Sequence, residues 1–326
     1  MNPADFSSFF VKPSSSSPKK IEEIPINSEK KSYKKPLSRK FERIFLGSIL
    51  SFLFSDEKLP FSLIASESSN FDDEINRVDC LACLSFDAPV LEEESELSFS
   101  YLPLGFDITV SGERKKILEK LVKSSKNPDP LPFGFTKLKF FKTPEEIREE
   151  PLVPRFVVGV SDYDVDSLSR AVKSPDSLSA QKFRFKILSE LKTELDFYLS
   201  MLPDSFNPEV AKKSLGFLSL FNKILNASLE ECSLKLLDEE LIETSEKNPF
   251  KLRSALENYF IKESKEAFRE EKLSRNLRPG YNRSRVTDDD AYAQILTLGS
   301  ELLATAFDPS SKISALRNIT PRSSAL

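Results

Sequence analysis

The feature that most restricts this chain is its shortage of glycine. Only 8 of its 326 residues are glycine, and no two of them lie closer than seven positions. A G-x-G-x-x-G dinucleotide turn and a G-x-x-x-x-G-K-S/T phosphate loop both need glycines at shorter spacing. Neither loop can therefore occur in this chain.

The chain also contains no histidine and no tryptophan. Histidine is the side chain whose ordinary pKa lies nearest neutral pH, and it is the commonest general base and metal ligand. Its absence excludes most familiar hydrolytic and zinc-dependent sites. No remaining motif identifies a family or a reaction.

The composition is typical of a folded, intracellular protein. Apolar residues make up 39% of the chain, including 27 phenylalanines, and the formal net charge is only −4, so attraction to a polyanion must come from local patches. Three cysteines, an odd number, favour a reducing compartment. The first thirty residues lack the apolar stretch of a signal peptide, and the strongest apolar run, residues 44–54, is too short for a bilayer, which needs roughly 20 residues. We expect a soluble cytoplasmic protein without a transmembrane segment.

Hydrophobic periodicity predicts an α+β fold, with an N-terminal mixed α/β lobe, a mainly α-helical C-terminal lobe and disordered tails. The expected boundaries are a basic arm over 1–37, the α+β lobe over 38–165, a helical bundle over 166–307 and a polar tail over 308–326. Helices are expected near 39–55, 112–122, 183–199, 208–225, 229–243, 249–273 and 288–307. Strands are expected near 81–86, 97–102, 106–110, 137–142 and 155–160.

Two basic segments are candidates for binding phosphate groups. The arm carries Lys30, Lys31, Lys34 and Lys35, followed by Arg39. The second segment spans an expected helix end and turn and contains Arg275, Arg278, Tyr281, Arg283 and Arg285. Arginine suits bidentate phosphate contacts, and a tyrosine can stack on an unpaired base. The competing interpretation is a solvated helix terminus, where basic residues favour the negative dipole end.

Acidic residues form two further groups. Residues 67–96 hold ten acids and one arginine and end in Glu92-Glu93-Glu94-Ser95-Glu96, an acidic face that could meet the basic arm or a neighbouring copy. Asp162, Asp164 and Asp166 follow an expected apolar strand at alternate positions. Carboxylates in that arrangement could hold Mg²⁺, although a solvated turn with Asp166 as a helix N-cap is the simpler interpretation.

Cys80 and Cys83 have the two-residue spacing of a redox or zinc half-site. The segment around them is apolar and strand-like, and a zinc ion would lack ligands because the chain has one other cysteine and no histidine. Buried, unreactive thiols are therefore the favoured interpretation.

The pattern as a whole favours a non-enzymatic protein that binds nucleic acid, with single-stranded RNA the first candidate, and assembles into a homo-oligomer like a nucleoprotein or coat protein. It would need no cofactor, and its phosphate contacts would give salt-dependent affinity. Two alternatives remain open. One is a Mg²⁺-dependent phosphoryl or nucleotidyl transferase using Asp162 and Asp164, and the other is a scaffold that binds only proteins.

Overall fold

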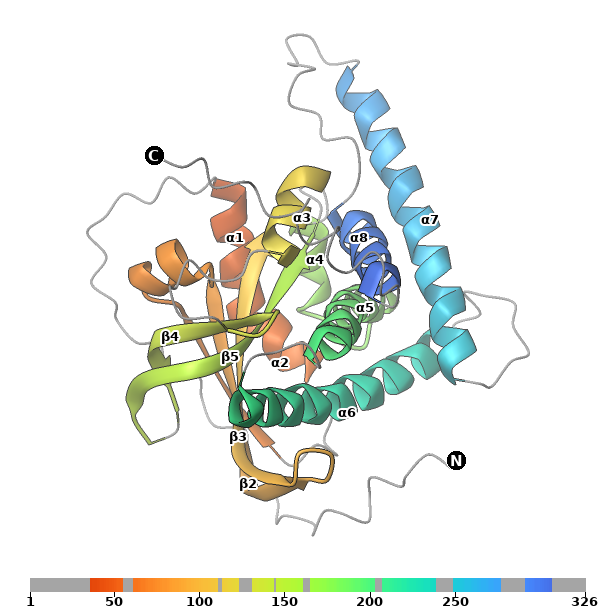
Figure 1. The fold of residues 1–326 in the computed structure, drawn as a ribbon. Coiled ribbons are helices and arrows are strands. Elements are labelled where there is room, and N and C mark those ends of the chain that lie inside the picture. The colour runs from red at the N-terminus through yellow and green to blue at the C-terminus, as the bar shows by residue number, and fades with distance from the viewer. Residues whose placement is uncertain are drawn as a thin grey trace.

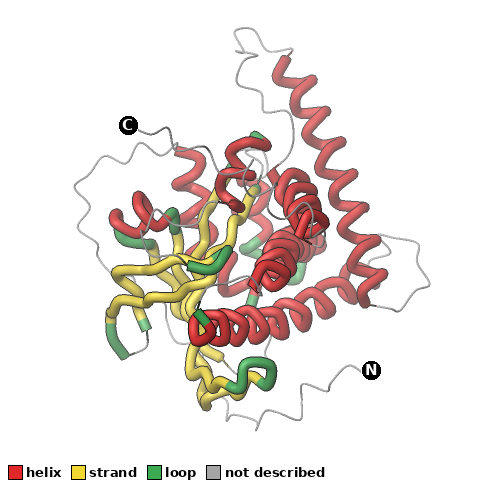
Figure 2. Tube along the Cα trace, viewed as in Figure 1, coloured by secondary structure: helices red, strands yellow, loops and turns green. Residues whose placement is uncertain are grey.

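The computed structural model describes residues 36–54, 61–110, 113–122, 131–143, 145–160, 165–202, 207–238, 249–276 and 291–306. It confirms the predicted α+β fold, with a five-stranded sheet in the N-terminal half and helices in the C-terminal half (Figures 1 and 2). The strands are β1 (Phe61–Glu67), β2 (Cys80–Glu92), β3 (Leu97–Thr109), β4 (Phe135–Lys142) and β5 (Ile147–Gly159). The helices are α1 (Pro36–Ile44), η2 (Phe45–Ile49), α2 (Leu50–Leu53), η3 (Asp72–Asn76), α3 (Arg114–Val122), α4 (Val165–Ala171), α5 (Leu178–Met201), α6 (Pro208–Asp238), α7 (Pro249–Asn276) and α8 (Ala291–Ala306).

The sheet is mixed, with strand order β1-β2-β3-β5-β4. Neighbouring strands are antiparallel except for β3 and β5, which run parallel from the pair Gly105 and Arg155 to the pair Thr109 and Gly159. The parallel pair is joined through α3 and β4, so α3 directly follows the carboxyl end of β3.

The carboxyl ends of β3 and β5 extend beyond the strands beside them, and acidic side chains satisfy their outer N–H groups. The Asp79 carboxylate accepts a hydrogen bond from the N–H of Ile108 in β3 at 2.6 Å. On the far side, Glu190 of α5 accepts one from the N–H of Gly159 in β5 at 3.1 Å. Buried backbone donors need such partners, so these carboxylates close the sheet edges where no strand continues.

Helix α5 is the centre of the helical half, where it packs against β5, α6 and α8 (Figure 1). Its buried apolar residues join one continuous cluster that runs from Phe41 in α1 to Leu302 in α8 and includes residues of the sheet. A contact between the rings of Phe156 in β5 and Phe221 in α6, at 5.0 Å between centroids, is typical of this core. The sheet and the helices are therefore held together by shared apolar burial.

Several elements differ from the expected ones. Strand β1 was not predicted, and the two strands expected at 97–102 and 106–110 are the single strand β3. The two helices expected at 208–225 and 229–243 are the single helix α6. Among the described helices, none combines the length and the apolar character that a bilayer crossing requires.

Candidate functional site

Most of the basic residues selected from the sequence lie outside the described residues. This holds for Lys30, Lys31, Lys34, Lys35, Arg278, Tyr281, Arg283 and Arg285. Arg39 lies in α1 and is exposed, and Arg275 lies in the last turn of α7. The candidate phosphate-binding surface formed by these residues therefore stays a prediction.

Most of the proposed metal site also lies outside the described residues. Asp162 and Asp164 lie outside the described residues, and Asp166 is the second residue of α4. Across the part of the chain that the structure describes, no three acidic or cysteine side chains are grouped closely enough to hold a metal ion.

The cysteines are buried and free, as predicted. Cys80 packs into the large core cluster, whereas Cys83 packs into a smaller cluster with Val78, Leu138 and Val153, so the two thiols of the C-x-x-C segment are separated by the sheet. Burial raises the pKa of Cys83 to about 12, with a smaller contribution from Glu150. A thiol with such a pKa is not an activated nucleophile at neutral pH.

The acidic turn between β2 and β3 rests on α6. Both carboxylate oxygens of Glu92 accept hydrogen bonds from Lys223 Nζ, at 3.0 and 2.9 Å, and the Glu94 carboxylate accepts one from the Ser219 hydroxyl at 2.6 Å. Gly216 of α6 allows this close approach, because a Cβ there would lie 2.5 Å from the Phe99 ring. Glu92 and Glu94, two residues of the predicted acidic face, therefore hydrogen-bond to α6 of the same chain.

A surface site that the sequence did not predict is built around the buried carboxylate of Asp72 in η3. One of its oxygens accepts a hydrogen bond from the N–H of Lys139 at 3.0 Å, and the other accepts one from the N–H of Phe140 at 3.4 Å. Asn76 and the Ser69 hydroxyl also donate to it, each at 2.7 Å. In the pairing of β4 with β5, Lys139 and Phe140 together form a bulge, and Asp72 fixes that bulge to η3.

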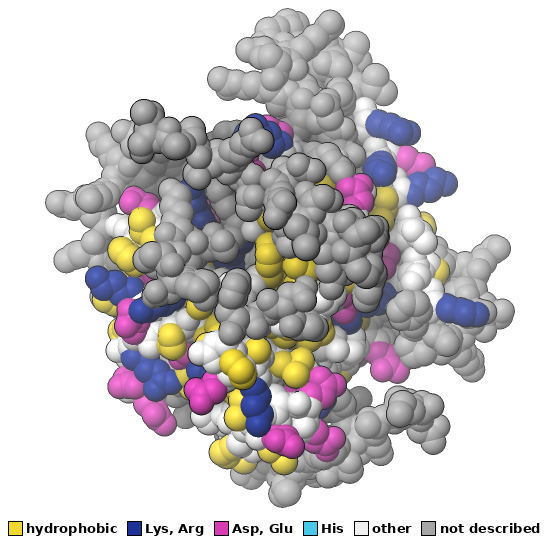
Figure 3. Space-filling model, in the orientation of Figure 1, with side chains coloured by type: hydrophobic (Ala, Val, Ile, Leu, Met, Phe, Trp, Pro, Cys, Tyr) yellow, Lys and Arg dark blue, Asp and Glu magenta, His cyan; other side chains and the backbone are white. Residues whose placement is uncertain are grey.

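The bulge turns two consecutive side chains of β4 outward. Phe140 is 47% exposed, and Phe71, which directly precedes η3, is 45% exposed. The ammonium of Lys139 lies over both rings, 5.1 Å from the Phe71 ring centroid and 5.6 Å from that of Phe140. Figure 3 shows apolar, basic and acidic side chains next to one another on the side of the molecule where β4 lies. We call Phe71, Lys139 and Phe140 the aromatic-lysine surface.

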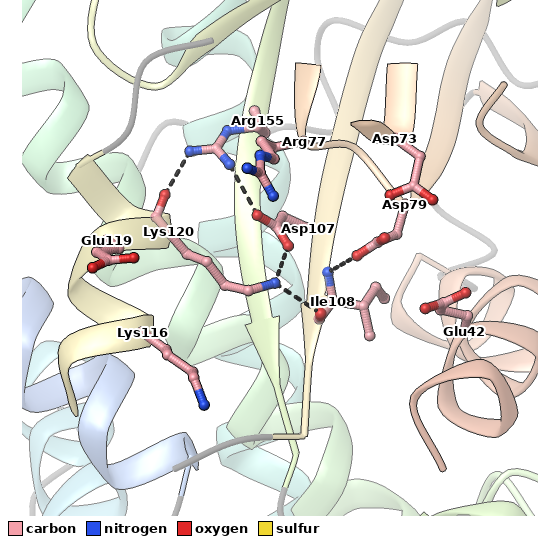
Figure 4. Close-up of a pocket in the computed structure, with 10 residues that line it drawn as sticks. All are labelled: Glu42, Asp73, Arg77, Asp79, Asp107, Ile108, Lys116, Glu119, Lys120 and Arg155. Atoms are coloured by element: carbon pink, nitrogen blue, oxygen red, sulfur yellow. Dashed lines mark hydrogen bonds and ion pairs between the residues drawn. The ribbon is translucent and has the colours of Figure 1, made fainter. Parts of the chain in front are cut away.

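Nine charged residues and one isoleucine line a pocket of about 320 Å³ beside η3 (Figure 4). They come from α1, η3 and its flanks, β3, α3 and β5: Glu42, Asp73, Arg77, Asp79, Asp107, Ile108, Lys116, Glu119, Lys120 and Arg155. Figure 4 shows Glu42, Asp73 and Asp79 on one side and Lys116, Lys120 and Glu119 on the other, with the two arginines between them.

The floor of this pocket is an ion-pair network across the parallel strands. Arg155 of β5 donates to the Asp107 carboxylate of β3 at 3.1 Å and to the backbone oxygen of Lys120 at 2.5 Å. The Lys120 ammonium pairs with the other Asp107 oxygen and donates to the backbone oxygen of Ile108 at 3.0 Å. Asp107 and Arg155 are 5% and 2% exposed, so two cations share one buried carboxylate at this floor.

Neither site could be located from sequence spacing, because each is assembled from segments far apart in the chain. One local signal was present for the aromatic-lysine surface, namely the consecutive Phe140 and Phe141 in a strand whose residues should alternate between core and solvent. For the pocket, a positive φ at Arg77 is the distinguishing feature, and it is visible only in the backbone.

The chain matches no protein-family model, no curated protein and no solved structure.

Proposed function

We propose that the protein binds single-stranded nucleic acid, in the first place RNA, and does not act on it chemically. The observation that carries this proposal is the aromatic-lysine surface, in which one ammonium lies over two half-exposed phenyl rings. Unpaired bases stack on exposed aromatic side chains, and lysine neutralises the neighbouring phosphates. Such a surface suits a single strand because the bases of a duplex are already stacked.

The construction of the surface supports this role. The two rings come from segments about 70 positions apart in the sequence, and the buried Asp72 carboxylate fixes their backbones to one another. No acidic side chain among the described residues forms an ion pair with Lys139. Its neighbour Lys137, by contrast, pairs with Glu149 at 3.2 Å. Segments whose backbones are fixed in advance lose less conformational entropy on binding, which favours affinity.

The experiment is a binding series with single- and double-stranded RNA and DNA over a range of salt concentrations. Phe140→Ala and Phe71→Ala should each weaken binding of single-stranded RNA by roughly tenfold, the loss expected for one stacked base. Lys139→Gln should reduce the slope of log affinity against log salt by about 0.7, the value for one phosphate contact on a single strand. Leu234→Ala, which removes a 49% exposed side chain of α6, and the exposed Lys173→Gln are the matched controls.

Equal affinity of the wild type and of all three variants would contradict the proposal, and so would the absence of RNA binding at low salt. A preference for single-stranded DNA would support the aromatic-lysine surface as the binding site and identify DNA instead of RNA as its ligand. Deletion of residues 1–37, and replacement of Arg278, Arg283 and Arg285, test separately whether the predicted basic segments add phosphate contacts. The mass of the protein in solution, with and without RNA, tests the proposed homo-oligomer.

A further inference from the structure

The polar pocket beside η3 is chemically unlike the aromatic-lysine surface and points to a different ligand. Among the residues that line it, Ile108 is the one apolar side chain, and none is aromatic. A nucleobase or an aromatic cofactor would find no ring to stack on there. Nine of the ten lining residues are charged, so the pocket offers a ligand charged hydrogen bonds.

The charges of the pocket are separated across its width. The side formed by α1, η3 and the residue before β2 contributes the carboxylates Glu42, Asp73 and Asp79, whereas α3 contributes Lys116 and Lys120 together with Glu119 (Figure 4). The first side repels an anion, and the second side, with two cations and one carboxylate, favours an anion. A ligand with one charge of each sign fits both.

The floor of the pocket adds a cation that a ligand can reach. Arg155 and Lys120 both pair with the Asp107 carboxylate, and the Arg155 and Asp107 side chains are nearly inaccessible to solvent. The Lys120 side chain is 29% exposed and lines the pocket, so its ammonium is accessible to an anionic group of a ligand.

Arg77 supplies a second cation from an unusual backbone conformation. It caps the end of η3 with φ of 59°, in the left-handed region where glycine is the usual residue, and its own N–H bonds to the Asp72 carbonyl. An arginine there is less stable than glycine would be, yet it directs a guanidinium to the pocket between the two charged sides (Figure 4). Strain of this kind at a pocket is typical of a binding residue.

We propose that this pocket binds a small zwitterion of the free amino acid type. Its ammonium would face Glu42, Asp73 and Asp79, and its carboxylate would face Arg77 and Lys116. The volume of about 320 Å³ corresponds to about ten water molecules at the ~30 Å³ that each occupies in the liquid, which is enough for an amino acid and too large for a single ion.

The test is calorimetric titration and thermal unfolding of the full chain with each standard free amino acid at millimolar concentration. For each amino acid that binds, the N-acetyl and methyl ester derivatives follow, because each removes one of the two charges. Binding by at least one free amino acid, weakened about tenfold or more by either blocking group, is the expected result. No binding by any member of the set, or equal binding of the blocked forms, overturns the proposal.

Arg77→Gly is the decisive variant, because glycine suits the left-handed conformation and should leave the fold at least as stable. We expect it to weaken binding about tenfold, as Lys116→Gln should, without lowering the midpoint of thermal unfolding in the absence of ligand. Lys173→Gln, an exposed lysine outside the pocket, is the control. Unchanged affinity of Arg77→Gly and Lys116→Gln would overturn the proposal. RNA binding by the same variants should be unaffected, which separates this site from the aromatic-lysine surface.

Discussion

Glu194 of α5 accepts a hydrogen bond from the backbone N–H of Val157 in β5 at 2.9 Å. One turn earlier in the same helix, Glu190 accepts a hydrogen bond from the backbone N–H of Gly159. The spacing of four residues on a helix matches that of two residues on a strand, about 6 Å in each case. Helix α5 therefore completes the hydrogen bonding of β5 beyond the point where β4 ends, and it does so with acidic side chains that are almost wholly buried.

The burial of Glu194 predicts a specific dependence of stability on pH. Desolvation raises the pKa of its carboxyl from an ordinary value of 4.5 to about 8, against the opposing effects of the Val157 N–H and Tyr198. Between these values the folded state holds a proton that the unfolded state has released. The free energy of unfolding therefore falls as pH rises, since stability decreases wherever the folded state binds more protons.

Glu194→Gln keeps the shape of the neutral side chain and removes its titration. We expect the variant to lose this part of the pH dependence, so that its stability relative to wild type increases from about pH 5 to about pH 8.5. Urea unfolding across that range measures it, with the exposed Glu230→Gln of α6 as control. A parallel shift of both curves with pH would mean that Glu194 does not titrate in this window.

Asp72 is predicted to be the most sensitive acidic position of the sheet edge. Asp72→Ala would leave the N–H groups of Lys139 and Phe140 and the Asn76 amide without their acceptor. We expect a loss of about 3 kcal/mol in the free energy of unfolding, because several donors lose one buried carboxylate together. Chemical denaturation compares it with Asp87→Ala, an exposed aspartate of β2 that should change stability by less than about 0.5 kcal/mol.

The sequence predicted the fold class because helical and strand periodicities differ clearly in the two halves of the chain. Its errors occurred where tertiary contacts override local signals. Two strands were expected at 97–102 and 106–110, and Pro103 lies in the gap between them. Because β5 pairs with β3 only from Gly105 onward, the proline lies where β3 has a neighbour on one side only, and the strand continues through it. Likewise, the two helices expected at 208–225 and 229–243 are one helix, and the residues expected to separate them continue it, with Ser228 and Leu229 both buried.

The two candidate sites were beyond sequence reasoning for a related reason. Basic residues were sought as runs along the chain. Lys139, however, contacts Phe71, a distant residue that the hydrogen bonds between Asp72 and β4 bring next to it. In the pocket, Asp107 and Arg155 become partners only because β3 and β5 run parallel in one register. Such pairings depend on topology, which a single sequence with no recognisable motif does not specify.

Two lysines of α6 should differ sharply in their contribution to stability. Lys223 bonds both oxygens of Glu92, which is wholly buried, whereas Lys212 lies 3.4 Å from the 81% exposed Glu96. Lys223→Met leaves a buried carboxylate without this partner, and we expect a loss of about 2 kcal/mol. Lys212→Met should fall within about 0.5 kcal/mol of wild type, as for exposed ion pairs in general. Equal losses in the free energy of unfolding, measured with urea, would show that the burial of Glu92 does not make its pairing with Lys223 the more stabilising of the two.

Gly134 provides the sharpest test of the packing between the sheet and α5, with Gly47 as the comparison. Gly134, which precedes β4, has φ of 75°, and a Cβ there would lie 2.4 Å from the ring of Tyr198. Tyr198 is wholly buried and donates to Glu194 at 3.1 Å, so its ring has no room to move aside. Gly134→Ala combines backbone strain with a steric clash and should destabilise the protein by about 3 kcal/mol.

Gly47 is the matched position, because it lies in helix η2 and nothing would contact an added Cβ within 4 Å. Alanine is favoured over glycine in helices, so Gly47→Ala should raise stability by up to about 1 kcal/mol. Thermal unfolding of the two variants should therefore shift in opposite directions. A Gly134→Ala protein as stable as wild type would mean that α5 does not approach β4 as closely as the Tyr198 ring requires, and the carboxylate bonds from α5 to β5 would need a different geometry.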